Sequence, residues 1–225
     1  CIRDSLKPAA PPRSAAPPPP AAALRWFRRH RESAPPSIAA TPSTARVAIK
    51  PNFTYPFYKP GVTTNPAVLE AVVSLIRTRT DKITIVESDG GSYAWPAQEA
   101  FAGHHVDQIC ARYGARAVNL TEYPREWAET EIFGRQIKLE MSRLLLHETD
   151  VFITMPVPKV HVMTRVSLGF KNQWGCLPDV KRLRNHHDFA YKVLAINKLL
   201  NPQMVIFDGT YFLNRTGRWK AILSK

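Results

Sequence analysis

The sequence predicts an α/β fold, with a mostly parallel, Rossmann-like open sheet that carries helices on both faces. Two observations predict it. Five short, nearly continuous apolar runs, rich in β-branched residues, recur along the chain, as expected for strands that are buried on both faces. Segments with apolar residues at helical spacing lie between several of these runs, and strands that alternate with helices form parallel sheets.

The expected strands are bounded by turn residues. They are RVAIK (46–50), KITIVES (82–88), ARAVNL (115–120), TDVFITMPV (149–157) and QMVIFDG (203–209). Three segments predict helices, at 63–80, 94–114 and 187–202. In the first of these, Thr64 or Asn65 can cap the helix, and Pro66 suits its first turn. Residues 131–141 predict an inserted hairpin or an edge strand.

The first part of the chain differs from this pattern. Residues 1–45 hold ten of the 20 prolines, together with Ala, Ser and Arg. Such a composition cannot bury enough apolar surface to offset the entropy of ordering, so we expect disorder there. A targeting role for this Arg-rich segment is the alternative. Residues 46–225 are then expected to form a single α/β domain.

The formal net charge of +13 invites a nucleic-acid interpretation. However, residues 1–46 and 215–225 carry 12 of the 31 Lys and Arg residues against two acids, which leaves 19 bases and 16 acids between them. The middle of the chain is therefore nearly neutral, and we do not expect nucleic acid as a partner.

The cysteines indicate the compartment. Cys1, Cys110 and Cys176 are far apart and form no C-x-x-C pair, so they supply no iron–sulfur ligand set and no disulfide framework. This usage fits a reducing compartment, and we expect a cytoplasmic protein. No apolar run approaches the roughly 18 residues that a membrane span requires, so no membrane association is expected.

The ends of the expected strands predict a functional site. In an open α/β sheet, ligands bind in the crevice beyond the carboxyl ends of the strands. Four expected strand ends carry polar or charged residues and lead into loops that contain Gly or Pro. The residues expected at this rim are Lys50, Asn52, Glu87, Asp89, Lys159, His161 and Asp208.

The stretch MPVPKVHVMTRVSLGFKNQWGCLP (155–178) is unusual because it places polar residues among apolar ones. Pro156 and Pro158 lack a backbone donor and take the chain out of the sheet, which sets Lys159 and His161 over the rim.

Residues 164–175 of this stretch predict a helix whose first turn points free N–H groups at the crevice, a favourable place for an anion. Lys171 and Asn172 would add a charge and a hydrogen-bonding group to the site. Alternatively, Lys171 is a surface lysine and Asn172 ends the helix.

Two further patterns carry less weight. His186, His187 and Asp188 could bind a metal together with His161, but neighbouring histidines often point apart and Asp188 suits a helix N-cap, so no metal site is expected. The segment SDGGSYAW (88–95) resembles a phosphate loop, yet it lacks both G-x-G-x-x-G and G-x-x-x-x-G-K-S/T, so it predicts no nucleotide site.

Five blocks in this order carry a family resemblance: AIKPNF, GVTTNP, TIVESDGG, DVFITMPVPKVHVMTRVSLGFKNQWGCLP and VIFDGT. On these blocks, residues 46–214 resemble the family of the domain of unknown function 362. The resemblance implies an α/β domain of bacterial or archaeal type, often joined to a ferredoxin-like module that binds two 4Fe–4S clusters, and it implies no reaction.

This chain departs from the family pattern at several places. Asn65 stands where family members typically have His, and Val160 and His161 end a shortened form of the motif Lys-x-Lys-Thr-His. The ferredoxin cysteines do not occur in this chain. Because the family pattern continues beyond NRTGRWKAILSK, we expect the domain to be truncated at its C-terminus.

The leading functional interpretation is an enzyme-like domain that binds a small anionic molecule, a carboxylate or a phosphate, at the rim. Lys50, Lys159 and Lys171 would hold the negative charge. Asn52, Thr63, Thr64 and Asn172 would orient the ligand. His161, with Asp89 or Asp208, would move a proton. The cofactor, the reaction and whether the chain is an enzyme are left open.

Two alternatives belong to other classes. The first is a redox accessory module whose basic patch docks a ferredoxin-type iron–sulfur protein. The second is nucleic-acid binding through the basic ends, which ranks last because the middle of the chain is nearly neutral and lacks an aromatic and basic reading surface.

Overall fold

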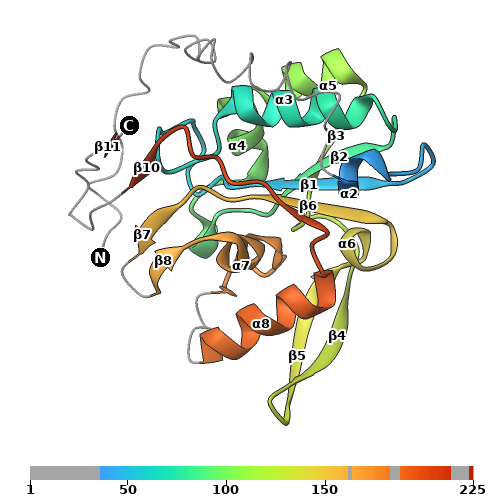
Figure 1. Cartoon of the computed structure of the whole chain (residues 1–225). Coiled ribbons are helices and arrows are strands. Elements are labelled where there is room, and N and C mark those ends of the chain that lie inside the picture. Colours follow the sequence, from blue (N-terminus) through green and yellow to red (C-terminus); the bar gives the residue numbers. More distant parts are fainter. Residues whose placement is uncertain (1–35, 162–163, 183–187, 214–222, 225) are drawn as a thin grey trace.

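The computed structural model describes residues 36–161, 164–182, 188–213 and 223–224. Five parallel strands form its central sheet (Figure 1). In the order in which they pair, they are β3 (Arg116–Asn119), β2 (Ile83–Glu87), β1 (Val47–Pro51), β6 (Val151–Met155) and β9 (Met204–Val205). Each strand coincides with one of the five apolar runs, so the predicted parallel, Rossmann-like sheet is confirmed.

Helices cover both faces of this sheet, as predicted (Figure 1). On one face lie α3 (Pro66–Arg77), α4 (Ala97–Gly103) and α5 (Val106–Tyr113). On the other lie α6 (Arg143–His147), α7 (Gly169–Asn172) and α8 (Phe189–Leu200). Every residue of β1 and β2 is buried, because apolar clusters pack against both faces of the sheet. This explains why these strands are continuously apolar in sequence.

The other elements are shorter or lie outside the central sheet. They are α2 (Pro36–Ala39), the 3₁₀ helices η1 (Gly91–Tyr93) and η2 (Gln173–Cys176), the hairpin β4 (Arg125–Ile132) and β5 (Arg135–Ser142), and a second sheet of β11 (Leu223–Ser224), β10 (Phe212–Leu213), β7 (Lys159–His161) and β8 (Arg165–Ser167). Among the described residues, no helix is long and apolar enough to cross a membrane.

The strand order creates a crevice at one place in the sheet. The chain moves outward from β1 to β2 and β3, then returns to place β6 on the other side of β1. At this reversal the connections leave the sheet in opposite directions, and open α/β sheets bind ligands beyond the carboxyl ends of the strands at such a point.

Two helix predictions need correction. The expected helix at 94–114 is two helices, because His105 adopts a left-handed conformation with φ 57° between α4 and α5. The expected helix at 164–175 does not begin at Thr164. Val166 pairs with Val160 in the β7–β8 ladder instead, and the helix α7 begins at Gly169. Pairing with the preceding strand in a short hairpin here overrides the helical pattern.

The expected disordered segment 1–45 lies mostly outside the described residues. Residues 36–45 are described, and they include α2. Ile38 is 2% exposed and belongs to the core cluster beneath α3, and Ala45 is buried just before β1. Packing therefore extends into residues 36–45, where the average composition of the segment predicts none.

Candidate functional site

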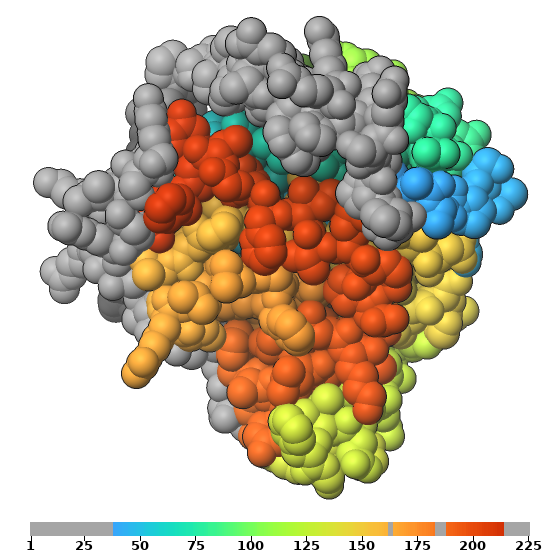
Figure 2. Space-filling view, viewed as in Figure 1, coloured from blue at the N-terminus to red at the C-terminus, as the bar shows by residue number. Residues whose placement is uncertain are grey.

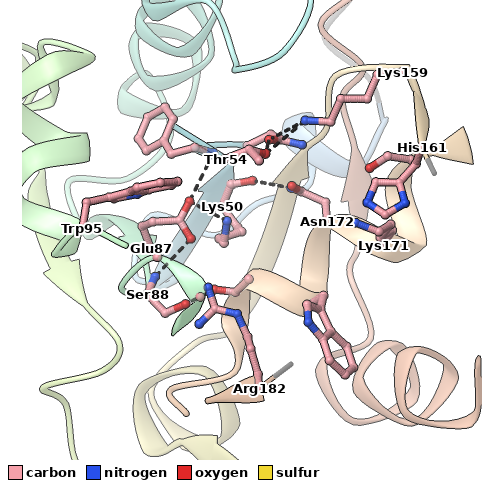
Figure 3. Close-up of a pocket in the computed structure, with 17 residues that line it drawn as sticks. Lys50, Thr54, Glu87, Ser88, Trp95, Lys159, His161, Lys171, Asn172 and Arg182 are labelled. Carbon is pink, nitrogen blue, oxygen red and sulfur yellow. Dashed lines mark hydrogen bonds and ion pairs between the residues drawn. The ribbon is translucent and has the colours of Figure 1, made fainter. Parts of the chain in front are cut away.

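A pocket of about 250 Å³ opens at the carboxyl ends of β1 and β2, close to the reversal in strand order (Figure 3). Most residues expected at the rim line this pocket. Lys50 and Asn52 come from the end of β1, and Glu87 from the end of β2. The stretch that follows β6 supplies Lys159, His161, Lys171 and Asn172. Pro156 directly follows β6, as expected for a residue that takes the chain out of the sheet.

A buried ion pair lies at the base of the pocket. The Nζ of Lys50 lies 2.8 Å from Oε2 of Glu87, and the two side chains are 2% and 5% exposed. The backbone N–H groups of Phe53 and Ser88 also donate to this carboxylate. Burial raises the pKa of Glu87, whereas the ammonium of Lys50 and the N–H donors oppose that rise. The pair thus satisfies its own charge and ties together the exits of two strands.

Lys159 has different partners. Its Nζ donates to Oδ1 of Asn52 at 3.1 Å, to Oγ1 of Thr54 at 3.0 Å and to the carbonyl of Val62 at 2.6 Å. These acceptors are neutral, so they orient the ammonium without cancelling its charge. Burial and the nearby ammonium groups of Lys171 and Lys50 lower the pKa of Lys159 to about 7.

Two more cations complete the pocket. Burial lowers the pKa of Lys171. Burial also lowers the pKa of Arg182, which is 8% exposed and donates to the main-chain oxygen of Asp89 at 2.7 Å. Among the described residues that line the pocket, Glu87 carries the only carboxylate, against four Lys and Arg side chains. The interior is therefore positively charged.

His161 and Asn172 lie on the same side of the pocket as Lys171 (Figure 3). Nδ1 of His161 accepts a hydrogen bond from the backbone N–H of Thr164 at 3.4 Å. The amide of Asn172 donates to the main-chain oxygen of Lys50 at 3.1 Å and to Oγ1 of Thr154 at 2.8 Å. Asn172 thereby fixes α7 to the ends of β1 and β6.

Two expected carboxylates do not line the pocket. Asp89 accepts from the backbone N–H of Ala97 at 2.8 Å and so holds the start of α4. Asp208 is 3% exposed and accepts from the N–H of Asn65 at 2.6 Å, next to the start of α3. Both carboxylates satisfy helix-entry N–H groups that would otherwise lack partners.

The two expected threonines also hold the surrounding loops. Oγ1 of Thr64 accepts from the N–H of Asn52 at 2.7 Å and donates to the carbonyl of Met155 at 2.8 Å, which joins the loops after β1 and β6. Oγ1 of Thr63 accepts from the N–H of Lys59 at 2.8 Å. Neither threonine lines the pocket.

A comparison of the sequence with models of protein families identifies the family of this chain. The model described as Domain of unknown function (DUF362) matches residues 47–223, from β1 to β11. The chain belongs to the DUF362 family. This confirms the resemblance found in the sequence. A comparison with curated proteins gave no match.

Some pocket residues of this DUF362 domain were not predicted. Arg182 reaches the pocket from a segment without helical or strand periodicity, so no sequence signal placed it there. Trp95 follows the Gly-Gly pair after β2, and a loop at a strand end is the signal that could have found it. Trp174 is 8% exposed and also contributes to the wall.

Metal ligands do not gather in the described part of the chain. Among these residues, no group of three or more His, Cys, Asp and Glu side chains could hold a metal ion. His186 and His187 lie outside the described residues. Burial raises the pKa of Cys176 to about 12, so this thiol stays protonated and is a poor ligand or nucleophile.

The ion pair predicts a strong and non-additive effect on stability. Lys50→Met leaves the Glu87 carboxylate buried without its cation, which is expected to lower the free energy of unfolding by about 3–5 kcal/mol. The double variant Lys50→Met/Glu87→Leu removes both charges and is expected to lose much less than the sum of the single variants. Urea unfolding of the four proteins measures this, and simple additivity would contradict the account of the pair.

Lys159 predicts a pH dependence of stability. Below pH 7 its ammonium is charged in the folded and unfolded chains alike. As pH rises above about 7, the folded chain releases this proton, while the unfolded chain keeps it up to the ordinary value of 10.5. The unfolded chain then binds more protons, so this residue adds stability as pH rises through that window.

The measurement compares the wild-type chain with Lys159→Met by urea unfolding at several pH values between 6 and 10. We expect the difference in stability between the two proteins to change with pH above 7, in the direction that favours the wild type. A difference that stays constant across this range would show that Lys159 has an ordinary pKa.

Proposed function

We propose that this DUF362 domain binds a small molecule with an anionic group, a carboxylate or a phosphate, in the rim pocket. The observation that carries the proposal is the imbalance of charge, with four Lys and Arg side chains against Glu87 alone. Lys50 and Glu87 form an ion pair, and Arg182 interacts at longer range with Glu87 and with Asp89 and Asp179 outside the pocket. Lys159 and Lys171 form no ion pair with a carboxylate among the described residues that line the pocket. Buried cations are costly without an anion, and a bound ligand would supply one.

Each pocket residue has a role in this proposal. Lys159 and Lys171 hold the anionic group, and Arg182 adds charge from the opposite side. Asn52 orients Lys159 through the hydrogen bond to its Nζ. Asn172, Thr63 and Thr64 position the walls of the pocket, because their side chains bind the backbone of the neighbouring loops.

His161 is the residue that we assign to proton transfer. It lines the pocket beside Lys171, and a histidine ring can accept a proton at one nitrogen and donate from the other. Asp89 and Asp208 act from outside the pocket in this scheme, by fixing the helices α4 and α3 at the rim. The volume of about 250 Å³ favours a small ligand, since sites for drug-sized molecules span about 300–1,000 Å³.

Docking of a partner protein is a second candidate, and a separate surface favours it. The family resemblance alone suggests that this partner is a ferredoxin-type protein. We call this surface the apolar face; it is formed by β8, α7, α8, β9 and the turn of the β4–β5 hairpin (Figure 2). Its large apolar side chains are between 41% and 85% exposed, and they are Phe133, Val166, Leu168, Phe170, Val205 and Phe207. Monomeric proteins rarely expose so many together without a binding role.

The anion proposal predicts a ligand-dependent melting temperature. At pH 6.5, phosphate or a small carboxylate present at 100 times its dissociation constant is expected to stabilise the chain by about 2.7 kcal/mol, or several degrees. Lys159→Met should abolish most of this shift. Lys138→Met is the matched control, because this lysine is 56% exposed on the hairpin and should leave the shift unchanged.

The same shift is expected to shrink above pH 7, where Lys159 loses its charge. If no phosphate or carboxylate stabilises a folded chain, or if Lys159→Met responds like the wild type, the anion proposal fails.

The docking candidate predicts a different outcome. A reduced ferredoxin should bind the wild-type chain in calorimetry, and Phe170→Ser should weaken this binding, because it removes an apolar side chain that is 61% exposed. Tyr93→Ser is the control, since Tyr93 is 67% exposed but lies outside the apolar face. Equal binding by the two variants would contradict docking through this face.

A further inference from the structure

The pocket has an aromatic wall as well as cations. Phe53, Trp95 and Trp174 line it. Phe53 and Trp174 are 4% and 8% exposed, so most of their surface is committed to packing. Trp95 is partly exposed, and Figure 3 shows its indole on the side of the pocket opposite Lys159 and His161. A molecule in the pocket would therefore lie between the indole and a group of cations.

The indole of Trp95 is held in place before any ligand arrives. A Cβ atom at Gly90 would lie 2.9 Å from two carbons of the indole, so the loop can lie against the ring only because residue 90 is glycine. The N–H of Gly90 also donates to the carbonyl of Trp95 at 2.7 Å. Tyr55 stacks on the indole, with ring centroids 5.9 Å apart and planes 12° apart. An aromatic side chain fixed in this way loses little entropy when a ligand binds.

We propose that the ligand of this pocket is a planar aromatic or conjugated anion, with its ring against Trp95 and its anionic group toward Lys159 and Lys171. This inference rests on the proposed anion site and names the class of ligand that the site selects. The charged side alone would accept any small anion. The fixed indole adds a preference for flat rings, because offset or edge-to-face aromatic contacts are favourable beyond the burial of apolar area.

The packing alternative is that Trp95 only completes the core. Its indole does pack against the apolar cluster beneath α4. Packing alone, however, predicts no preference between a flat ring and a saturated ring of similar size. Ligand planarity therefore separates the two explanations.

Calorimetry of the full chain at pH 6.5 tests the inference with acetate, cyclohexanecarboxylate and benzoate. We expect benzoate to bind at least about tenfold more tightly than acetate, because the ring adds both apolar burial and stacking. Cyclohexanecarboxylate, which adds burial without a flat ring, should fall between them. Phosphate and phenyl phosphate form a second pair with the same expected order.

Two variants test whether Trp95 causes the preference for a flat ring. Trp95→Leu should bind acetate or phosphate like the wild type but lose the advantage of benzoate over cyclohexanecarboxylate. Trp127→Leu is the matched control, since this indole is 62% exposed on the hairpin and does not line the pocket, and it should retain the advantage.

The outcomes distinguish this inference from the anion proposal beneath it. If acetate or phosphate binds, but benzoate shows no advantage over cyclohexanecarboxylate or keeps it in Trp95→Leu, the inference is wrong and the anion site stands. If none of the anions binds to the folded chain, both are wrong.

Discussion

The ion pair between Lys50 and Glu87 is the interaction on which the arrangement of the rim depends. The two residues end neighbouring parallel strands, and burying either charge alone would cost several kcal/mol. Glu87 also accepts the N–H groups of Phe53 and Ser88, which lie within two residues of the ends of these strands. The pair therefore fixes where both loops begin. The pocket lies between those loops.

The stretch that follows β6 is built around this pair. A Cβ atom at Gly175 would lie 3.1 Å from the Nζ of Lys50 and 3.2 Å from Oε1 of Glu87, so glycine allows η2 to lie close to the pair. The hydroxyl of Ser88 donates to the carbonyl of Gly175 at 2.6 Å. Asn172 binds the backbone of Lys50 from the same segment. The sheet and this segment thus enclose one crevice, and Lys171 enters it because Asn172 and the following η2 fix the C-terminal end of α7.

These contacts explain why one buried lysine is neutralised and another is not. Lys50 is neutralised by its neighbour in the sheet, whereas Lys159 is surrounded by neutral oxygens of Asn52, Thr54 and Val62. A buried ammonium without a neighbouring carboxylate is the physical basis for the proposed anion binding. In the proposed site the cations would provide most of the affinity, and Trp95 would add a preference for flat rings.

The sequence predicted the strands and the residues at their ends. It did not predict which partners these side chains bind. Continuous apolar runs identified the five central strands, and the rule for strand ends placed Lys50 and Lys159 at one rim. The same rule says nothing about which partner a side chain finds there. Asp208 therefore binds a backbone N–H beside α3 instead of lining the pocket.

A local hairpin and one long-range contact account for the remaining differences. Val166 lies in a segment with a helical pattern, yet it pairs with Val160 in the β7–β8 ladder. Arg182 enters the pocket only because its segment returns past the loop after β2, where its guanidinium binds the carbonyl of Asp89. Neither contact leaves a periodic signal in the sequence.

The most direct test of the central claim is the titration of the Lys159 ammonium, followed by NMR with isotope-labelled lysine and assigned with Lys159→Met. The account predicts a midpoint near pH 7 in the free chain, because burial and two neighbouring ammonium groups oppose the charge. It also predicts that a bound anion raises this midpoint, since an anion favours the charged form. A midpoint near 10.5 that no anion moves would contradict an uncompensated cationic pocket.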